Sequence, residues 1–350
     1  MEDPRCVRFA SIEAAIEATA SYDDGFMNFC VGALHDHLQK SLEEEQYKNT
    51  EGYFFGIYRG ENLELMLALQ ATYDPTWKLF CPHNRQDSLT PPFLDLAAGL
   101  LVDNVLKYVE PEAVSSVFGY QAAVDAFATA LVARATTKGV DLNMKSLFIT
   151  ISSYATRDSI PPLLSTPSTY AMALATADDF EALIPLYLDF STFVPGVRTR
   201  EEDEARLRAV IASQLTWVCR VDGVIVGFIS LGRPSPKTIA VRHVYVLPAH
   251  RRKGIAEAMV GAATRYVLGL EPVGFEGAFE GPPTVGVKDF VYINAVDIAA
   301  SRVYRRAGFL FPEETADALE RGGIDPKSGK KSWFYSVLWC ITKPTVEQTE

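Results

Sequence analysis

Hydrophobic and polar positions in the second half of the chain change between strand-like and helix-like spacing. Alternation over 169–177 predicts a strand, and helical spacing follows over 178–190, where Pro185 predicts a kink or a break. A second helix is expected from Thr199, because Thr199 and Glu202 stand at the spacing of a capping box. The half therefore opens with a strand and two helices.

Further along, the pattern predicts strands at 216–221 and 224–232, which flank the turn residues Asp222 and Gly223. A strand over 238–247 leads into a helix that begins near Gly254, with Ile255, Met259 and Tyr266 on its buried face. A strand at 289–296, a helix at 297–308 and a strand at 332–341 complete the order β-α-α-β-β-β-α-β-α-β. Mixed α/β structure is the expected fold class.

The first half shows a partial version of the same pattern. It contains helical spacing at 26–42 and 91–109, a strand pair that turns at 59–62, and a strand at 146–154. Gly60 aligns with Gly223 at nearly the same offset that aligns the AVD triplets at 123–125 and 295–297. This offset suggests an ancient duplication.

Three prolines and several Ser and Thr residues interrupt the periodicity over 156–171. We therefore predict a domain at 1–155, a linker at 156–169 and a second domain at 170–350. A further segment, 269–288, is rich in Gly and Pro and has no periodicity. Two interpretations of it stay open, a flap over a site and a disordered surface loop.

Composition narrows the classes of function. The net charge of -11 argues against general nucleic-acid binding, which needs a broad basic face. The five cysteines are scattered, which indicates a reducing compartment, and we read them as buried apolar residues. No apolar run is long enough to span a membrane, so a cytoplasmic protein without a membrane partner is expected. His35 and His37, two residues apart on a helix, are expected at the surface. The sequence does not indicate an oligomeric state.

One basic cluster stands out against this acidic background. Arg251, Arg252 and Lys253 directly precede the helix that begins near Gly254. A helix start presents unpaired backbone amides and the positive end of the helix dipole, a combination that favours a phosphate. Small residues at 254 and 256 let a phosphate approach the main chain. The sequence thus predicts a local anion site that needs no metal.

The residues around this site resemble a known family. Arg251, Gly254 and Ala256 fit the R/Q-x-x-G-x-G/A signature of the GNAT acetyltransferases, and 297–309 is similar to the family segment that contains Ala300, Tyr304, Gly308 and Phe309. The resemblance covers about 168–342, and for the first half it is only topological. It implies the GNAT fold, which would occur as two tandem domains.

The resemblance also implies acetyl-CoA as acyl donor, held between the fourth and fifth strands. Main-chain groups of Val244, Tyr245 and Val246 would pair with the pantetheine arm. The cofactor-binding loop would comprise six residues: Arg251, Arg252, Lys253, Gly254, Ile255 and Ala256. Their amides would hold the pyrophosphate, and one of the three basic side chains would reach the 3′-phosphate. Tyr304 would protonate the departing thiolate, the alternative being a tyrosine that only packs in the core.

Two positions depart from the family pattern. The family has Asn where this chain has Asp297, which cannot donate through an amide and suits a helix N-cap; Asn294 is the substitute donor we expect. Some members place a carboxylate base on the fourth strand, where this chain has Val241. Strand alternation predicts that His243 and Tyr245 share a face with Val241, so His243 is the candidate base, the alternative being a structural histidine.

The first half lacks both family landmarks. Its counterpart of the phosphate loop, 81–93, has paired prolines and no glycine, and Val132 is expected where the second half has Tyr304. We therefore predict a degenerate first domain and an acetyl-CoA-dependent N-acetyltransferase that acts on a small amine, amino acid or xenobiotic. The alternatives are an inactive acyl-CoA-binding or interaction protein, and a protein acetyltransferase acting on lysines or N-termini.

Overall fold

The computed structural model describes residues 2–43, 52–70, 74–162, 170–193, 198–275, 277–315 and 318–343. The first half contains β1 (Arg5–Phe9), α1 (Ile12–Thr19), α2 (Ala33–Glu43), β2 (Gly52–Arg59), β3 (Asn62–Gln70), β4 (Asp74–Phe80), α3 (Pro91–Val105), β5 (Ser116–Tyr120), α4 (Gln121–Thr137) and β6 (Asn143–Ala155). The second half contains β7 (Ala171–Leu174), α5 (Phe180–Ser191), α6 (Arg200–Ala212), β8 (Thr216–Val221), β9 (Val224–Gly232), β10 (Thr238–Val246), α7 (Ile255–Val267), β11 (Phe290–Ala295), α8 (Ile298–Arg306) and β14 (Trp333–Thr342). A hairpin of β12 (Pro312–Thr315) and β13 (Ala318–Gly322) precedes β14. The two halves thus repeat one order of elements.

Local signals in the second half are confirmed. The Thr199 hydroxyl accepts from the Glu202 amide at 3.2 Å, and the Glu202 carboxylate accepts from the Thr199 amide at 2.8 Å, which completes the capping box. Asp222 and Gly223 both have positive φ, as the tight turn between β8 and β9 requires. Pro185 lies inside α5 without ending it. In the first half the pattern missed β1, α1, β4, β5 and α4.

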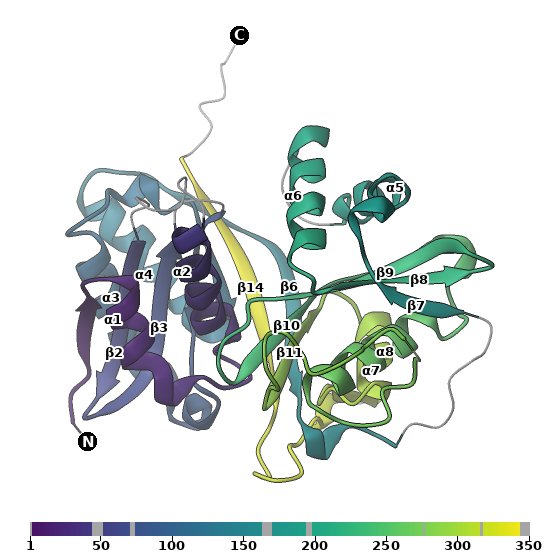
Figure 1. Ribbon diagram of the computed structural model, residues 1–350. Helices are drawn as coiled ribbons and strands as arrows, with labels where there is room; N and C mark the ends of the chain where they lie inside the picture. The colour runs from purple at the N-terminus through teal and green to yellow at the C-terminus, as the bar shows by residue number, and fades with distance from the viewer. Residues whose placement is uncertain are drawn as a thin grey trace.

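All strands except β12 and β13 form one sheet of 12 strands, in the order β1-β2-β3-β4-β5-β14-β6-β11-β10-β9-β8-β7. The last strand of each half is exchanged: β14 pairs with β5 of the first half, and β6 pairs with β11 of the second half. The two exchanged strands also pair with each other, and β14 runs through the middle of the molecule (Figure 1). Main-chain hydrogen bonds therefore cross the predicted domain limits, which themselves stay a prediction.

The direction of the central strands sets which helices share a face. Because β6 and β14 run antiparallel, the two halves are related by a rotation about an axis perpendicular to the sheet. Such a rotation keeps equivalent helices on the same side, so α1 and α2 lie on the same face as α5 and α6. The helices α3, α4, α7 and α8 cover the opposite face (Figure 1). We call these the α5 face and the α7 face.

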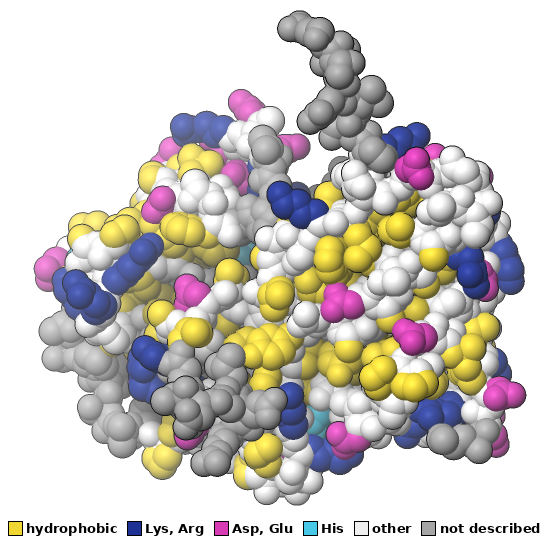
Figure 2. All heavy atoms as spheres, turned by 180° about the vertical axis from the view of Figure 1, so that it is seen from behind, with side chains coloured by type: hydrophobic (Ala, Val, Ile, Leu, Met, Phe, Trp, Pro, Cys, Tyr) yellow, Lys and Arg dark blue, Asp and Glu magenta, His cyan; other side chains and the backbone are white. Residues whose placement is uncertain are grey.

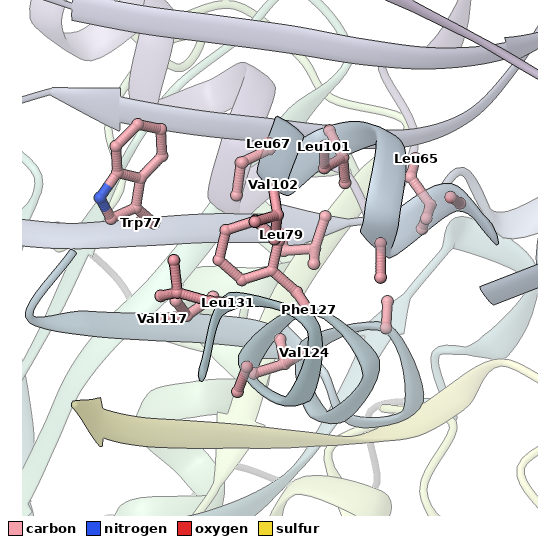
Figure 3. Close-up of a cluster of buried hydrophobic side chains, with 14 of the residues drawn as sticks. Leu65, Leu67, Trp77, Leu79, Leu101, Val102, Val117, Val124, Phe127 and Leu131 are labelled. Carbon is pink, nitrogen blue, oxygen red and sulfur yellow. The ribbon is translucent and has the colours of Figure 1, made fainter. Parts of the chain in front are cut away.

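Each half has its own hydrophobic core on each face. Figure 3 shows the first half's core on the α7 face, where Leu65, Leu67, Trp77 and Leu79 of the sheet meet Phe127 of α4 and the side chains of α3. On the α5 face, buried polar groups join the halves: the Asn28 amide donates to the Arg233 carbonyl at 3.0 Å, and the Asp23 carboxylate accepts from Ser235 at 2.7 Å.

Surface features agree with the acidic composition. On the face shown in Figure 2, Lys and Arg side chains lie in small groups among acidic and hydrophobic ones, and no broad basic surface is seen there. None of the described helices combines the length and the apolarity that crossing a membrane requires.

The segment 269–288, which is described except for residue 276, packs against the second half. The Trp217 indole donates to the Ala278 carbonyl at 2.9 Å, and its ring stacks on Phe279 with centroids 5.0 Å apart. Arg265 of α7 donates to the carbonyls of Pro272 and Glu271. These contacts hold the segment over β8 and α7, which differs from a disordered surface loop, and the role of a flap stays a prediction.

Candidate active site

The site is built around a gap between two parallel strands. β10 and β11 pair only at Thr238, Ile239 and Ala240, although β10 continues for six more residues to Val246. On its other side β11 stays paired with β6 as far as Ala295. Beyond Ala240, the main-chain groups on the facing edges of β10 and β11 therefore form no hydrogen bonds between these two strands.

Main-chain direction along β10 identifies which residues face the gap. The Leu247 amide donates to the Val226 carbonyl of β9 at 2.9 Å. Because main-chain groups alternate along a strand, Val244 and Val246 direct theirs away from β9, toward the gap. Tyr245 directs its own toward β9 and donates its hydroxyl to Asp189, so the geometry does not favour Tyr245 as a cofactor contact. The Nε of Arg251 donates a hydrogen bond to the Val246 carbonyl at 2.9 Å, so this carbonyl already has a partner.

A β-bulge changes the faces predicted for β10. The register against β9 shifts between Val241 and His243, so two residues of β10 occupy the space of one. Val241 belongs to the core on the α7 face, whereas the His243 ring lies against Tyr187 and Phe190 of α5. The prediction that Val241, His243 and Tyr245 share a face is therefore wrong, because it assumed unbroken alternation. His243 and Tyr245 share the α5 face without Val241.

His243 is enclosed by aromatic rings and surrounded by arginines. Its ring centroid lies 4.9 Å from that of Phe190 and 5.8 Å from that of Tyr187. Its buried Nδ1 has no hydrogen-bond partner among the residues that the structure describes. Burial, and then repulsion from Arg242, Arg233, Arg198 and Arg206, hold the pKa of His243 well below 6.5. The imidazole is therefore neutral at pH 7 and able to accept a proton.

The start of α7 is open to an anion. Gly254 is its N-cap with φ of 79°, a left-handed conformation that favours glycine, and no side chain of the described residues caps the helix. The first helical bond runs from the Ala258 amide to the Gly254 carbonyl at 3.0 Å. The amides of Ile255, Ala256 and Glu257 consequently have no partner within the helix. Arg252 and Lys253 are exposed beside them.

Tyr304 packs near this helix start. On the α7 face it joins the same core as Val244 and Ala256. An ion pair of 2.5 Å between Arg306 and Glu257 connects the last turn of α8 to the first turn of α7. Burial, with a smaller effect from the Asp297 carboxylate, raises the pKa of Tyr304 to about 12, so the phenol keeps its proton. No hydrogen bond joins its hydroxyl to the described part of the chain.

Asp297 and Asn294 lie in different parts of the site. Asp297 is the N-cap of α8, where its Oδ1 accepts from the Ala300 amide at 2.7 Å. Asn294 follows Tyr292 on the α5 face, since Val291, Ile293 and Ala295 pack in the core on the α7 face. Asn294 is thus on the side of His243, across the sheet from the start of α7. No group of three potential metal ligands occurs among the described residues.

In the first half, the loop that precedes α3 is held by a buried carboxylate. The Glu64 carboxylate of β3 accepts from Arg85 and Ser88 of the loop before α3, with 2.6 Å from the Ser88 hydroxyl. When α4 and α8 are aligned by their N-caps, Tyr120 and Asp297, Phe127 is the counterpart of Tyr304. The expectation of Val132 is wrong, because the AVD triplet lies inside α4 in the first half and before α8 in the second.

Comparison with known proteins gives one family match and several similar solved structures. Residues 180–277 match the model of the Acetyltransferase (GNAT) family. Among solved structures, the chain is similar to a tandem GNAT protein from the clavulanic acid biosynthesis pathway, with 12% identity, 97% of this chain and 98% of that chain covered, and a TM-score of 0.47. It is also similar to a GCN5-related N-acetyltransferase from Sphaerobacter thermophilus, with 14% identity, 98% of each chain covered and a TM-score of 0.48. No curated protein sequence matches the chain significantly.

The family match begins at the start of α5 and ends beyond α7, so it includes the bulged strand and the open helix start. The second half therefore contains a segment that matches the GNAT acetyltransferase family, and the first half repeats the order of elements of the second. Sequence reasoning had identified the helix start and Tyr304. It missed Arg233, Arg242 and Phe190 beside His243, for which the only signal was their place next to predicted strands and helices.

Proposed function

We propose that the second half transfers the acetyl group of acetyl-CoA to the amine of a small molecule. The diphosphate of the donor binds the amides of Ile255, Ala256 and Glu257, with Arg252 and Lys253 beside it. The pantetheine arm pairs with the main chain of Val244 in the gap between β10 and β11. The first half supports this domain without binding a donor of its own.

In the proposed reaction the amine attacks the thioester carbonyl while the neutral imidazole of His243 receives the amine proton, directly or through water. The tetrahedral intermediate then expels the thiolate of CoA, and the phenol of Tyr304 supplies its proton. Tyr304 suits this role because its raised pKa of about 12 keeps it protonated in the resting protein. The C–S bond breaks, an amide C–N bond forms, and no metal takes part.

One observation carries the proposal: an uncapped helix start stands beside two strands that have separated. The start of α7 offers amides without partners, and β10 offers unpaired main-chain groups along the path toward Tyr304. Backbone donors of this kind favour an extended ligand with a phosphate at one end. The donor of the GNAT family, acetyl-CoA, has this shape and charge.

A test of the proposal combines binding and turnover. Calorimetry with CoA should show binding, and release of free thiol from acetyl-CoA should depend on an added amine. Tyr304→Phe should lower kcat by about 100-fold, the scale of a lost general acid, and leave the affinity for CoA unchanged. Tyr266→Phe is the matched control, since Tyr266 lies against Trp217 and Phe279, away from the gap.

Two results would contradict the proposal in different ways. CoA binding without thiol release from any amine would favour the alternative, an inactive acyl-CoA-binding protein. Unchanged kcat in Tyr304→Phe would remove the proposed acid but retain the transferase. The amine substrate and the cytoplasmic location stay predictions from the sequence.

A further inference from the structure

The side chain of Arg251 is directed back to the strand that precedes it. Its Nε donates to the Val246 carbonyl at 2.9 Å, and its Cζ lies 5.6 Å from the centroid of the Tyr245 ring. Tyr245 packs in the core on the α5 face, whereas Ile255 in the first turn of α7 packs in the core on the α7 face. The guanidinium of Arg251 is therefore engaged with β10 and not with the start of α7.

These contacts continue to the helix α5. The Tyr245 hydroxyl donates to the Asp189 carboxylate near the C-terminal end of α5. The Tyr245 ring also lies 6.4 Å from the ring of Phe190, the next residue of that helix. A continuous set of contacts thus joins Arg251 to a helix on the α5 face. We call Arg251, Tyr245 and Asp189 the loop anchor.

The loop between β10 and Gly254, residues 247–253, has a main chain that needs support. A bond from the His250 amide to the Leu247 carbonyl at 2.9 Å closes its first turn. Arg252 then has φ of 62°, a left-handed conformation that is unfavourable for residues other than glycine. Such a conformation persists where the surrounding contacts hold the chain in place. The hydrogen bond from the preceding side chain to β10 supplies a contact of this kind.

The three basic residues of the loop differ in what their side chains contact. All three are exposed. Arg251 uses its Nε for the main chain of β10, whereas neither Arg252 nor Lys253 forms a hydrogen bond or an ion pair with the described part of the chain. A cation on an exposed side chain beside a helix start suits a phosphate. The basic residues therefore divide into one that holds the loop and two that are available to an anion.

We infer that Arg251 is a positioning residue: its hydrogen bond to the Val246 carbonyl, supported by the rest of the loop anchor, fixes the loop so that the amides at the start of α7 face the donor. The inference rests on the proposed function, and it assigns the phosphate contacts of the basic side chains to Arg252 and Lys253. A substitution in the loop anchor on the α5 face should consequently alter the affinity for CoA, although the diphosphate binds at the start of α7.

Two substitutions at Arg251 separate positioning from charge. The amide nitrogen of glutamine is as many bonds from Cα as the Nε of arginine, so Arg251→Gln keeps a donor for the Val246 carbonyl and removes the cation. Lysine has a methylene group at that place, so Arg251→Lys keeps the cation and removes the donor. Calorimetry should give a Kd for CoA about fivefold or more higher in Arg251→Lys than in Arg251→Gln, the scale of one hydrogen bond. Both variants lose the guanidinium, so a general effect on folding is common to them.

Arg252 is the matched control, because it has the same side chain at the next position of the loop. A phosphate contact depends on charge, so Arg252→Gln should weaken CoA binding more than Arg252→Lys, which is the reverse order. Added salt screens such a contact. Arg252→Gln should therefore make the Kd for CoA less sensitive to salt, whereas Arg251→Gln should not.

Tyr245→Phe and Asp189→Ala test the remainder of the loop anchor. Each removes one side of the hydrogen bond between Tyr245 and Asp189, and each should raise the Kd for CoA by about threefold. Combined with Arg251→Lys, Tyr245→Phe should add less than its separate effect, because residues in one set of contacts are not additive. Tyr187→Phe is the control on α5: its ring packs against Phe228, and the Kd should stay within about twofold.

Several outcomes would overturn the inference. Equal Kd values in Arg251→Gln and Arg251→Lys would show that the hydrogen bond to β10 does not matter, and tighter binding in Arg251→Lys would make Arg251 a phosphate ligand. Unchanged affinity in both Tyr245→Phe and Asp189→Ala would overturn the connection to α5. All of these results leave the proposed function intact, whereas absence of CoA binding in the unmodified protein would overturn both.

Discussion

The two halves contain the same order of elements but differ in the loop that precedes their third helix, which is α3 in the first half and α7 in the second. Before α7, the loop ends in Gly254 and leaves the first amides of the helix open. Before α3, the loop carries Arg85, which forms an ion pair with the buried Glu64, and the helix itself begins with Pro91 and Pro92. Proline has no amide hydrogen, so this helix start offers fewer donors to a phosphate. An ion pair with a buried carboxylate holds the loop before α3, whereas the start of α7 has amides without partners in the helix.

The two halves also differ in how far their fourth strand, β10 or β4, extends past its parallel pairing with the fifth strand. In the second half β10 extends six residues past its last pair with β11, and in the first half β4 ends one residue past the pair of Leu79 with Gly119. Gly119 allows this close approach, since a Cβ there would lie 1.8 Å from the Leu79 carbonyl oxygen. A few local changes thus separate a half with an open helix start from a half without one, while the packed core is retained in both.

The largest expected effect concerns the filled loop. Glu64→Ala should lower the free energy of unfolding by about 3 kcal/mol, because it leaves the cations of Arg59 and Arg85 without their buried partner. Denaturant unfolding measures the change. Glu61→Ala is the control, since Glu61 is exposed and lies 4.0 Å from Arg5. A loss similar to that of the control would show that this ion pair does not hold the loop.

The same carboxylate predicts a dependence of stability on pH. Burial alone would raise the pKa of Glu64, but hydrogen bonds from Arg85, Ser88 and Arg59 outweigh it and hold the pKa below 4.5. A folded pKa below the unfolded one gives stability that is present above pH 4.5 and lost as the pH falls through the folded value. Glu64→Ala should therefore differ most from the unmodified protein at neutral pH and less below pH 4.5.

The open loop gives the next largest effect. Gly254→Asp should weaken CoA binding by about 100-fold, or about 2.7 kcal/mol, because a carboxylate would cap α7 and repel the diphosphate. Thr90→Asp places the same group at the N-cap of α3 and should leave the affinity unchanged. Calorimetry with CoA compares the two variants. Equal losses in both would show that the first half also binds CoA.

Histidines of the two halves should respond differently to substitution. Because the pKa of His243 lies well below 6.5, its neutral form persists on acidification, and kcat should stay constant from pH 8.5 down to 6.5. Arg242→Gln removes one repelling cation, which should raise the pKa of His243 and move the acidic fall of kcat to higher pH. His83→Gln should not move it, since His83 of the first half contacts the Lys331 carbonyl of the second half at 3.0 Å, away from His243. A fall centred near pH 6.5 in the unmodified protein would contradict this role of His243.

The smallest effect concerns the N-cap of α8. Asp297→Ala should cost about 1 kcal/mol of stability, the usual value of a side-chain cap, whereas Asp297→Asn should cost little. α4 begins without a side-chain cap at Tyr120, so the first half has no comparable sensitivity there. Thermal unfolding measures both variants. A larger loss in CoA affinity than in stability for Asp297→Ala would instead assign Asp297 to the donor.

Local signals explain why much of the second half could be predicted. The capping box at Thr199, the turn at Asp222 and the glycine before α7 each depend on neighbours within a few residues. The bulge at Arg242 could not be predicted, because it is expressed only in the pairing of β10 with β9. The arginines that act on His243 were missed for the same reason, since they come from separate elements that only the folded chain brings together.

The exchange of the last strands is the feature of the fold that the sequence indicates least. β6 follows α4 without any sign that its partner, β11, lies more than a hundred residues further along. Alternation predicts that 146–154 is a strand but not which edge it joins. The pattern of the first half also failed for β4 and β5.

The strand exchange has an evolutionary consequence for the half that lacks the open helix start. A deletion that removed residues 1–162 would take β6 away from β11, and β14 would lose β5, its neighbour on the other edge. Selection on the second half therefore preserves the first half, since neither gene segment can be discarded without exposing an unpaired strand edge. A gene split within 163–169 should be tolerated if both fragments are supplied together, because every strand could still pair with its neighbours in the sheet.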